Sequence, residues 1–179
     1  MDDGEPFPPR VVLVGFMGCG KSTIGPRVAR PLDYGFLDMD EAIEERMGLS
    51  VAAIFRERGE AAFREEERRL AAEIAGRDRL IVAAGGGAFA QPATRAALQE
   101  GSLAVWLRCE LATLLARIPD DGTRPLARSR ETIGLLFAER EPSYRLADVT
   151  VDASDAPPDE VAQRVVAALR GYRRRTMER

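Results

Sequence analysis

GFMGCGKST, at residues 15–23, is the stretch of this sequence that decides the fold. It contains the pattern G-x-x-x-x-G-K-[ST], in which glycines let backbone N–H groups turn inward around phosphate oxygens. Residues 10–14, RVVLV, are typical of a short buried strand, and a helix is expected from Ser22 to about Leu32. A strand, a glycine-rich loop and a helix in this order predict a nucleotide triphosphate site rather than a chance match in a turn, because the helix N-terminus adds a positive dipole end.

Lys21 is the only lysine of the chain, because the other 25 of its 26 basic residues are arginine. Its flexible ammonium is predicted to reach the β- and γ-phosphates, and the Ser22 hydroxyl to ligate Mg²⁺. Cys19, inside the loop, is expected to contribute its backbone rather than its thiol.

Length and composition limit the classes of protein that fit this chain. It has 179 residues, 45% hydrophobic and 31% charged, with a net charge of −3, which predicts one globular domain and neither a general nucleic-acid binder nor a membrane protein. No histidine is present, so histidine-based catalysis and metal binding are excluded. Two cysteines and an N-terminus without a signal-peptide pattern favour a reduced, cytoplasmic location.

Strand-like and helical segments alternate along the chain, which predicts an α/β fold with a parallel sheet covered on both faces. Residues 1–9 are proline-rich and are expected to be a flexible lead-in, and residues 119–130 (PDDGTRPLARSR) to be a mobile segment. Further strands are expected at residues 36–38, 80–83, 103–107 and 149–151, and further helices at 41–47, from 51, at 60–75, from 92, and at 111–118, 131–146 and 157–172.

Asp38 and Asp40 flank Met39 at the end of the second expected strand. On an extended segment this spacing points both carboxylates the same way, toward the P-loop at the carboxyl edge of the sheet. One is predicted to hold Mg²⁺ through water and the other to accept a proton from a substrate hydroxyl. The alternative is an ordinary turn in which Asp40 caps the next helix.

Three glycines, Gly85, Gly86 and Gly87, follow the third expected strand. They expose backbone N–H groups and permit close approach of a small ligand, although a tight turn is the alternative. Ala83 and Ala84 stand where many P-loop proteins carry an acidic metal ligand, so Asp38 is the nearest candidate for that role.

Arginines supply the remaining candidates. Arg64 lies four residues after Glu60 and three before Glu67, and a guanidinium braced in this way suits a carboxylate ligand, unless it only belongs to a solvated charged face.

Three further arginines come from the second half of the chain. Arg124, in the mobile segment, resembles a lid arginine that closes over the γ-phosphate, with a surface-loop arginine as the alternative. Arg117 is expected either to stack on adenine or to serve as a helix C-terminal cation. Arg145 is a candidate to converge with Arg64 on an anion.

Taken in order, these motifs resemble the shikimate kinase family over residues 10–169. The resemblance rests on GFMGCGKST (15–23), FLDMDEAIE (36–44), GEAAFREEE (59–67), GGG (85–87), TRPL (123–126) and REPSYRLAD (140–148). It implies a three-layer P-loop kinase fold with a five-stranded parallel sheet in the order 2-3-1-4-5, flanked by helices, and a mobile lid at about 118–130. It also implies a monomer with a single kinase domain, whose substrate-binding region lies at about 48–67.

The implied activity is transfer of the ATP γ-phosphate to the 3-hydroxyl of shikimate, with Mg²⁺, on the route to aromatic amino acids. Asp40 and Arg124 are implied to act in catalysis with Lys21, and Ser22 and Asp38 to hold the metal. The implied cofactor-binding residues are Gly18, Cys19, Gly20, Lys21, Ser22, Thr23, Arg117 and Arg124. The implied shikimate-binding residues are Asp40, Arg64, Gly85, Gly86, Gly87 and Arg145.

Two other functions share part of this pattern. A gluconate kinase or nucleoside monophosphate kinase has the P-loop and lid arginines, but does not require two arginines aimed at a carboxylate. A nucleotide-binding regulatory module without turnover is expected to lack Lys21, Asp40 or Arg124, and all three are present.

Overall fold

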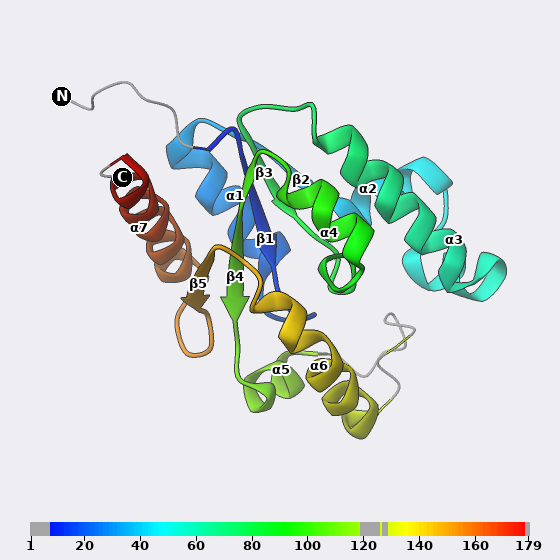
Figure 1. Ribbon diagram of the computed structural model, residues 1–179. Helices are drawn as coiled ribbons and strands as arrows, with labels where there is room; N and C mark the ends of the chain where they lie inside the picture. The colour runs from blue at the N-terminus through cyan, green and yellow to red at the C-terminus, as the bar shows by residue number, and fades with distance from the viewer. Residues whose placement is uncertain (1–7, 119–125, 127–128, 178–179) are drawn as a thin grey trace.

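The computed structural model of the chain describes residues 8–118, Leu126 and residues 129–177, apart from the side chains of 173–177. Five parallel strands form one sheet in the order β2-β3-β1-β4-β5, as expected (Figure 1). The strands are β1 (Arg10–Val14), β2 (Gly35–Asp38), β3 (Leu80–Ala83), β4 (Ser102–Arg108) and β5 (Val149–Asp152). Every residue of β1 and β3 is buried, because layers of helices cover both faces of the central strands.

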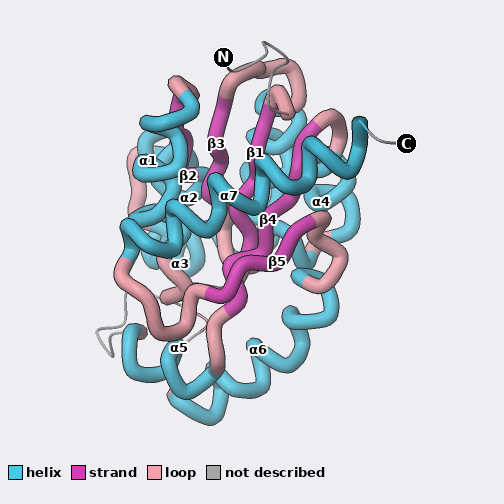
Figure 2. The backbone as a smooth tube through the Cα atoms, turned by 90° about the vertical axis from the view of Figure 1, so that its left-hand side faces the viewer, coloured by secondary structure: helices cyan, strands magenta, loops and turns pink. Residues whose placement is uncertain are grey.

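Helices cover the two faces of the sheet and form a three-layer architecture. They are α1 (Lys21–Leu32), α2 (Met39–Met47), α3 (Val51–Ile74), α4 (Pro92–Gln99), α5 (Leu111–Arg117), α6 (Arg130–Tyr144) and α7 (Pro158–Met177), with a 3₁₀ turn, η1 (Ala88–Ala90). Figure 2 shows α7 crossing one face of the sheet, and α1 and α7 contact each other there. The fourth helix packs on β4 and against α3, and α2 also contacts α3.

Strand register brings the candidate motifs to one edge of the sheet. Asp38 pairs with Ala83, and Ala83 pairs with Leu13, so β1, β2 and β3 end side by side. The P-loop, Asp38 and the triple glycine follow those three strand ends. Their meeting at the carboxyl edge is what the parallel arrangement predicts.

A kink at Gly59 divides α3 into two helical stretches, at the place where the sequence predicts that one helix ends and the next begins. The element spans Val51–Ile74, but Gly59, with φ 81° and ψ 164°, lies outside the helical region. Glycine reaches this backbone region without a Cβ clash. Ser50 caps the start of the helix through a 3.2 Å hydrogen bond from the Ala53 N–H.

Candidate active site

The P-loop surrounds the amino group of Lys21. Lys21 Nζ donates to the carbonyl oxygens of Gly15, at 2.8 Å, and Phe16, at 3.2 Å. Gly20, in the left-handed conformation, precedes the first turn of α1. The loop and α1 line a cavity, here called the P-loop cavity, of about 930 Å³ with part of it open to solvent. Its lining includes Gly18, Gly20, Lys21, Ser22, Thr23, Asp38, Asp40 and Arg117. Cys19 is buried within the loop.

Asp38 links the P-loop to α2. Ser22 Oγ donates a 2.5 Å hydrogen bond to Asp38 Oδ2, while Asp38 Oδ1 accepts from the N–H groups of Asp40, at 3.0 Å, and Glu41, at 3.4 Å. Asp38, not Asp40, is therefore the N-cap of α2. The prediction that residues 38–40 are extended is also wrong, because α2 begins at Met39. Both carboxylates nevertheless line the P-loop cavity.

A second cavity adjoins the first. This arginine cavity has a volume of about 790 Å³, part of it open to solvent. The side chains of Arg64, Glu67 and Arg140 line it together with the apolar Val51, Phe55 and Phe63. Four residues line both cavities: Met17, Asp40, Glu44 and Gly86. A group bound in one cavity therefore faces a group bound in the other across Asp40.

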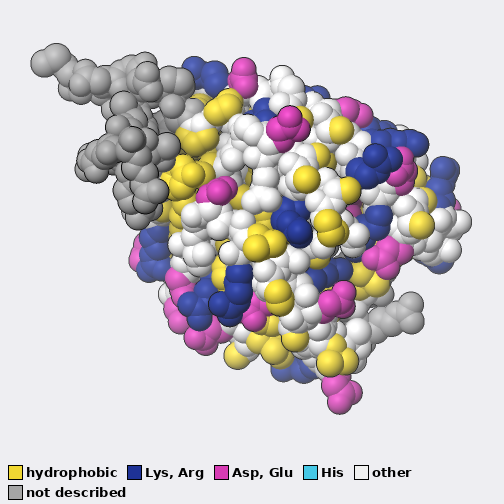
Figure 3. Space-filling model, in the orientation of Figure 1, with side chains coloured by type: hydrophobic (Ala, Val, Ile, Leu, Met, Phe, Trp, Pro, Cys, Tyr) yellow, Lys and Arg dark blue, Asp and Glu magenta, His cyan; other side chains and the backbone are white. Residues whose placement is uncertain are grey.

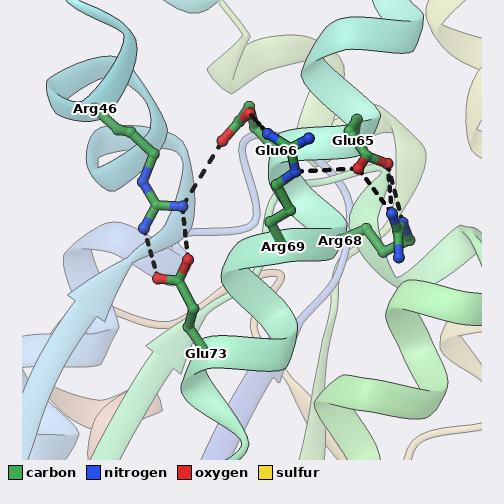
Figure 4. Close-up of polar contacts among 6 residues, drawn as sticks. All are labelled: Arg46, Glu65, Glu66, Arg68, Arg69 and Glu73. Atoms are coloured by element: carbon green, nitrogen blue, oxygen red, sulfur yellow. Dashed lines mark hydrogen bonds and ion pairs between the residues drawn. The ribbon is translucent and has the colours of Figure 1, made fainter.

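Arg64 is braced as its spacing predicts. Its Nε lies 3.0 Å from Glu60 Oε1 and its Nη1 lies 2.6 Å from Glu67 Oε2. Its side chain is only 16% exposed, whereas Arg68 and Arg69 are 55% and 58% exposed. Arg68 and Arg69 pair with Glu65 and belong to the solvated face of α3 (Figure 4).

Ion pairs also hold α2 against α3, which positions Asp40 relative to Arg64. Arg46 of α2 donates to both carboxylate oxygens of Glu73, at 3.0 and 2.6 Å, and lies 3.7 Å from Glu66 Oε2 (Figure 4). In Figure 3, basic and acidic side chains intermingle on this right-hand side of the molecule. The charges of this region therefore largely pair with one another.

The triple glycine lets three side chains of the site approach the backbone. A β-carbon on Gly87 would lie 2.6 Å from Arg64 Nη1 and Nη2, and one on Gly85 would lie 2.6 Å from Asp40 Oδ1 and Glu67 Oε1. Gly86 lines both cavities. Side chains at Gly85 or Gly87 would occupy space that the functional groups fill.

Arg145 does not converge with Arg64, which corrects that expectation. Its side chain is 64% exposed, pairs with Glu141 at 2.8 Å, and lies 5.9 Å from the ring centroid of Trp106. The residue that lines the cavity with Arg64 is Arg140, buried to 6% exposure one helical turn before Tyr144. Arg140 lies four residues before Tyr144 and therefore on the same face of α6, but the sequence does not show that this face meets the cavity.

Tyr144 joins α6 to the triple-glycine turn and so sets which face of α6 meets the cavity. Burial raises its pKa, so the hydroxyl stays protonated and donates to the carbonyl oxygen of Gly86. Burial and the nearby Arg64 charge lower the pKa of Arg140. Two buried guanidinium groups facing one cavity favour an anionic occupant there.

Arg117 lines the P-loop cavity and also joins α5 to the chain after β5. Its guanidinium donates to the carbonyl oxygens of Ala153, at 3.1 Å, and Ser154, at 2.6 Å. Arg124 lies outside the described residues, as does most of the lid expected at 118–130. Leu126, described within that segment, lines the arginine cavity.

Comparison with known proteins identifies the family. The family model described as shikimate kinase matches residues 17–170. A shikimate kinase of Salinibacter ruber is 43% identical over 177 residues, covering 92% of this chain and 86% of the relative. One of Moorella thermoacetica is 40% identical over 168 residues, covering 93% and 97%. The chain belongs to the shikimate kinase family. This membership confirms the predicted ATP-dependent shikimate kinase function.

Solved structures agree with the family assignment. The shikimate kinase from Acinetobacter baumannii in complex with shikimate has a TM-score of 0.88 at 32% identity, covering 92% of this chain and 94% of that one. A gluconokinase from Sinorhizobium meliloti has a TM-score of 0.62 at 18% identity, a similarity that concerns the fold alone. Among the described residues of this shikimate kinase family member, no helix is long and apolar enough to span a membrane.

Proposed function

We propose that phosphoryl transfer from ATP to the 3-hydroxyl of shikimate takes place where the P-loop cavity and the arginine cavity meet. The observation that carries this proposal is that Asp40 and Gly86 line both cavities. A phosphate held by the P-loop and a hydroxyl held in the arginine cavity then meet at Asp40.

The P-loop cavity is the proposed ATP site. Backbone N–H groups of residues 18–23 bind the phosphates, and Lys21 Nζ exchanges its carbonyl partners for phosphate oxygens. Arg117 flanks the same cavity and is proposed to contact the base. Arg124 is proposed as the lid residue, on the sequence resemblance alone.

Ser22 and Asp38 are the proposed Mg²⁺ ligands. Their hydroxyl and carboxylate oxygens lie 2.5 Å apart in the P-loop cavity, and this donor set suits a hard cation. Bound Mg²⁺ would neutralise charge on the phosphate oxygens. Asp38 is proposed to act through water, as its place in the N-cap of α2 leaves Oδ2 directed at Ser22.

The arginine cavity is the proposed shikimate site. Arg64 and Arg140 bind the carboxylate, and the apolar side chains of Val51, Phe55 and Phe63 cover the ring. Asp40 accepts a hydrogen bond from the acceptor hydroxyl and is proposed to take its proton. Arg140 replaces Arg145 in this role because only Arg140 lines the cavity.

The test is ADP release with Mg-ATP, measured in parallel with shikimate, gluconate and nucleoside monophosphates at matched concentrations. Turnover with shikimate alone supports the proposal. Turnover with another acceptor contradicts the assignment of the arginine cavity, and ATP binding without any turnover favours a regulatory module. A monomeric state and a cytoplasmic location stay predictions, which sedimentation and cell fractionation check.

A further inference from the structure

Glu67 is a carboxylate inside the arginine cavity that has no accessible surface. Its Oε2 accepts a 2.6 Å hydrogen bond from Arg64 Nη1. Its Oε1 is buried and accepts no hydrogen bond from the described part of the chain. Bracing Arg64 therefore uses only one of the two oxygens of Glu67.

The second oxygen of Glu67 faces another carboxylate. Glu67 Oε1 and Asp40 Oδ1 each lie 2.6 Å from the position that a β-carbon on Gly85 would occupy. The charged groups that act on Glu67 are Arg64 on its own helix, Asp40 on α2 and Arg140 on α6. The Gly85–Gly87 turn beside it carries no titratable side chain.

The innermost charges of the filled site balance only if Glu67 is neutral. Glu44, at the cavity wall, and Glu60, which pairs with Arg64, are in contact with solvent and are not counted among them. Arg64 and Arg140 contribute two positive charges, and Asp40 and the substrate carboxylate contribute two negative ones. An ionised Glu67 would add a third negative charge in a buried position, where an uncompensated charge is costly.

We propose that Glu67 holds a proton when the arginine cavity contains its carboxylate substrate, so that substrate binding and proton binding are coupled. The inference rests on the proposed placement of shikimate in this cavity. One proton passes from solvent to Glu67 Oε1, and no covalent bond of the substrate changes. The resulting O–H becomes a hydrogen-bond donor directed toward Asp40.

The electrostatics of the ligand-free site agree with this. Burial raises the pKa of Glu67 to about 7; Asp40 adds to the rise, and Arg64 and Arg140 oppose it. A bound carboxylate is a further negative charge and raises this pKa again. Near neutral pH the site therefore takes up protons as substrate binds, and binding weakens as the pH rises through 7.

Titration calorimetry of the full-length protein with shikimate tests the coupling. Titrations at pH 6, 7.5 and 8, each in two buffers of different ionisation enthalpy, give the number of protons taken up. We expect uptake of a fraction of a proton at pH 7.5 and a Kd that weakens roughly fivefold or more between pH 6 and pH 8. The chain has no histidine to contribute a competing signal in this range.

The Glu67→Gln variant separates proton binding from the bracing of Arg64. Glutamine is neutral, has the same size, and keeps an oxygen to accept from Arg64. We expect this variant to bind at pH 6 within about threefold of the parent, with no proton uptake and a Kd independent of pH. Glu65→Gln, on the outer face of the same helix, is the matched control and should keep the uptake of the parent.

Three results would overturn the coupling: parent protein that binds without proton uptake, uptake that persists in Glu67→Gln, or Glu67→Gln that does not bind at pH 6. The last would show that the ionised form of Glu67 is needed. Parent protein that binds no shikimate at any pH would instead refute the proposed function.

Discussion

Ser22 Oγ donates a 2.5 Å hydrogen bond to Asp38 Oδ2, joining the first turn of α1 to the end of β2 across 16 residues of sequence. Both residues line the P-loop cavity. The bond places a hydroxyl and a carboxylate together at the wall of this cavity.

Asp38→Asn should raise the Mg²⁺ concentration needed for half-maximal activity and lower kcat/KM by roughly 100-fold, because an amide oxygen carries no charge. Asparagine is also a good helix N-cap, so the free energy of unfolding should change by less than about 1 kcal/mol. Magnesium titrations of activity and urea unfolding measure the two effects. Asp159→Asn, an exposed change, is the control, and an unaltered Mg²⁺ requirement in Asp38→Asn would refute the metal assignment.

Asp40→Asn should lower kcat by roughly 100-fold or more with little change in the melting temperature, because Asp38 caps the helix and Asp40 does not. Steady-state kinetics and thermal unfolding test this. Glu45→Gln, on an exposed position of the same helix, should behave like the parent. If Asp40→Asn turns over nearly as fast as the parent, Asp40 does not take part in the chemical step.

Arg64→Ala and Arg140→Ala should each weaken shikimate binding by roughly 2–5 kcal/mol without a matching loss of ATP binding. Each change removes one of the two guanidinium groups proposed to pair with the substrate carboxylate. Arg145→Ala is the matched control from the same helix end, and its exposed pairing with Glu141 predicts an effect below about 1 kcal/mol. Calorimetric titration of both ligands measures all three variants. A larger loss in Arg145→Ala than in Arg140→Ala would reverse the assignment.

Gly87→Ala should raise the KM for shikimate while leaving the KM for ATP nearly unchanged. The new methyl group would lie 2.6 Å from both terminal nitrogens of Arg64, so the guanidinium must move away from its binding position. Gly76→Ala, where a β-carbon meets no atom within 4 Å, is the control. Equal increases in both KM values would indicate a general distortion instead.

The stability of the ligand-free protein should fall as the pH rises because of Glu67. Its pKa is raised from 4.5 to about 7 in the folded protein, so the folded state binds more protons than the unfolded chain between these values. The loss, at most roughly 3 kcal/mol, begins above pH 4.5 and is complete above pH 7. The free energy of unfolding of Glu67→Gln, measured in urea, should therefore exceed that of the parent at pH 8. The difference between variant and parent should be smaller at pH 5. An equal difference at both pH values would contradict the raised pKa.

Local motifs predicted much of this site, and helix orientation accounts for what they did not. The P-loop and the bracing of Arg64 depend on residues within a few positions of one another, so the spacing determined them. Choosing between Arg140 and Arg145 required knowing which face of α6 meets the cavity, and that depends on packing of Tyr144 against the Gly86 turn. The Asp38 cap was missed for a similar reason, because the sequence does not show that the helix begins at Met39.

The lid prediction remains untested by the fold, since Arg124 lies outside the described residues. The division of α3 at Gly59 agrees with the two helices expected there, because a glycine between two helical patterns is typical of a break. Strand order followed from the family resemblance and agrees with the register of all five strands.

The P-loop cavity contains the single ε-amino group of the whole chain, on a side chain that is 9% exposed. Arginine guanidinium groups do not react with acylating reagents under mild conditions, so the α-amino group is the only other amine target. The amine of Lys21 in the proposed nucleotide site is therefore the only lysine side chain that an acylating reagent can modify. The extent of its acylation, followed by mass spectrometry, reports directly on whether phosphates occupy the loop, without any engineered label.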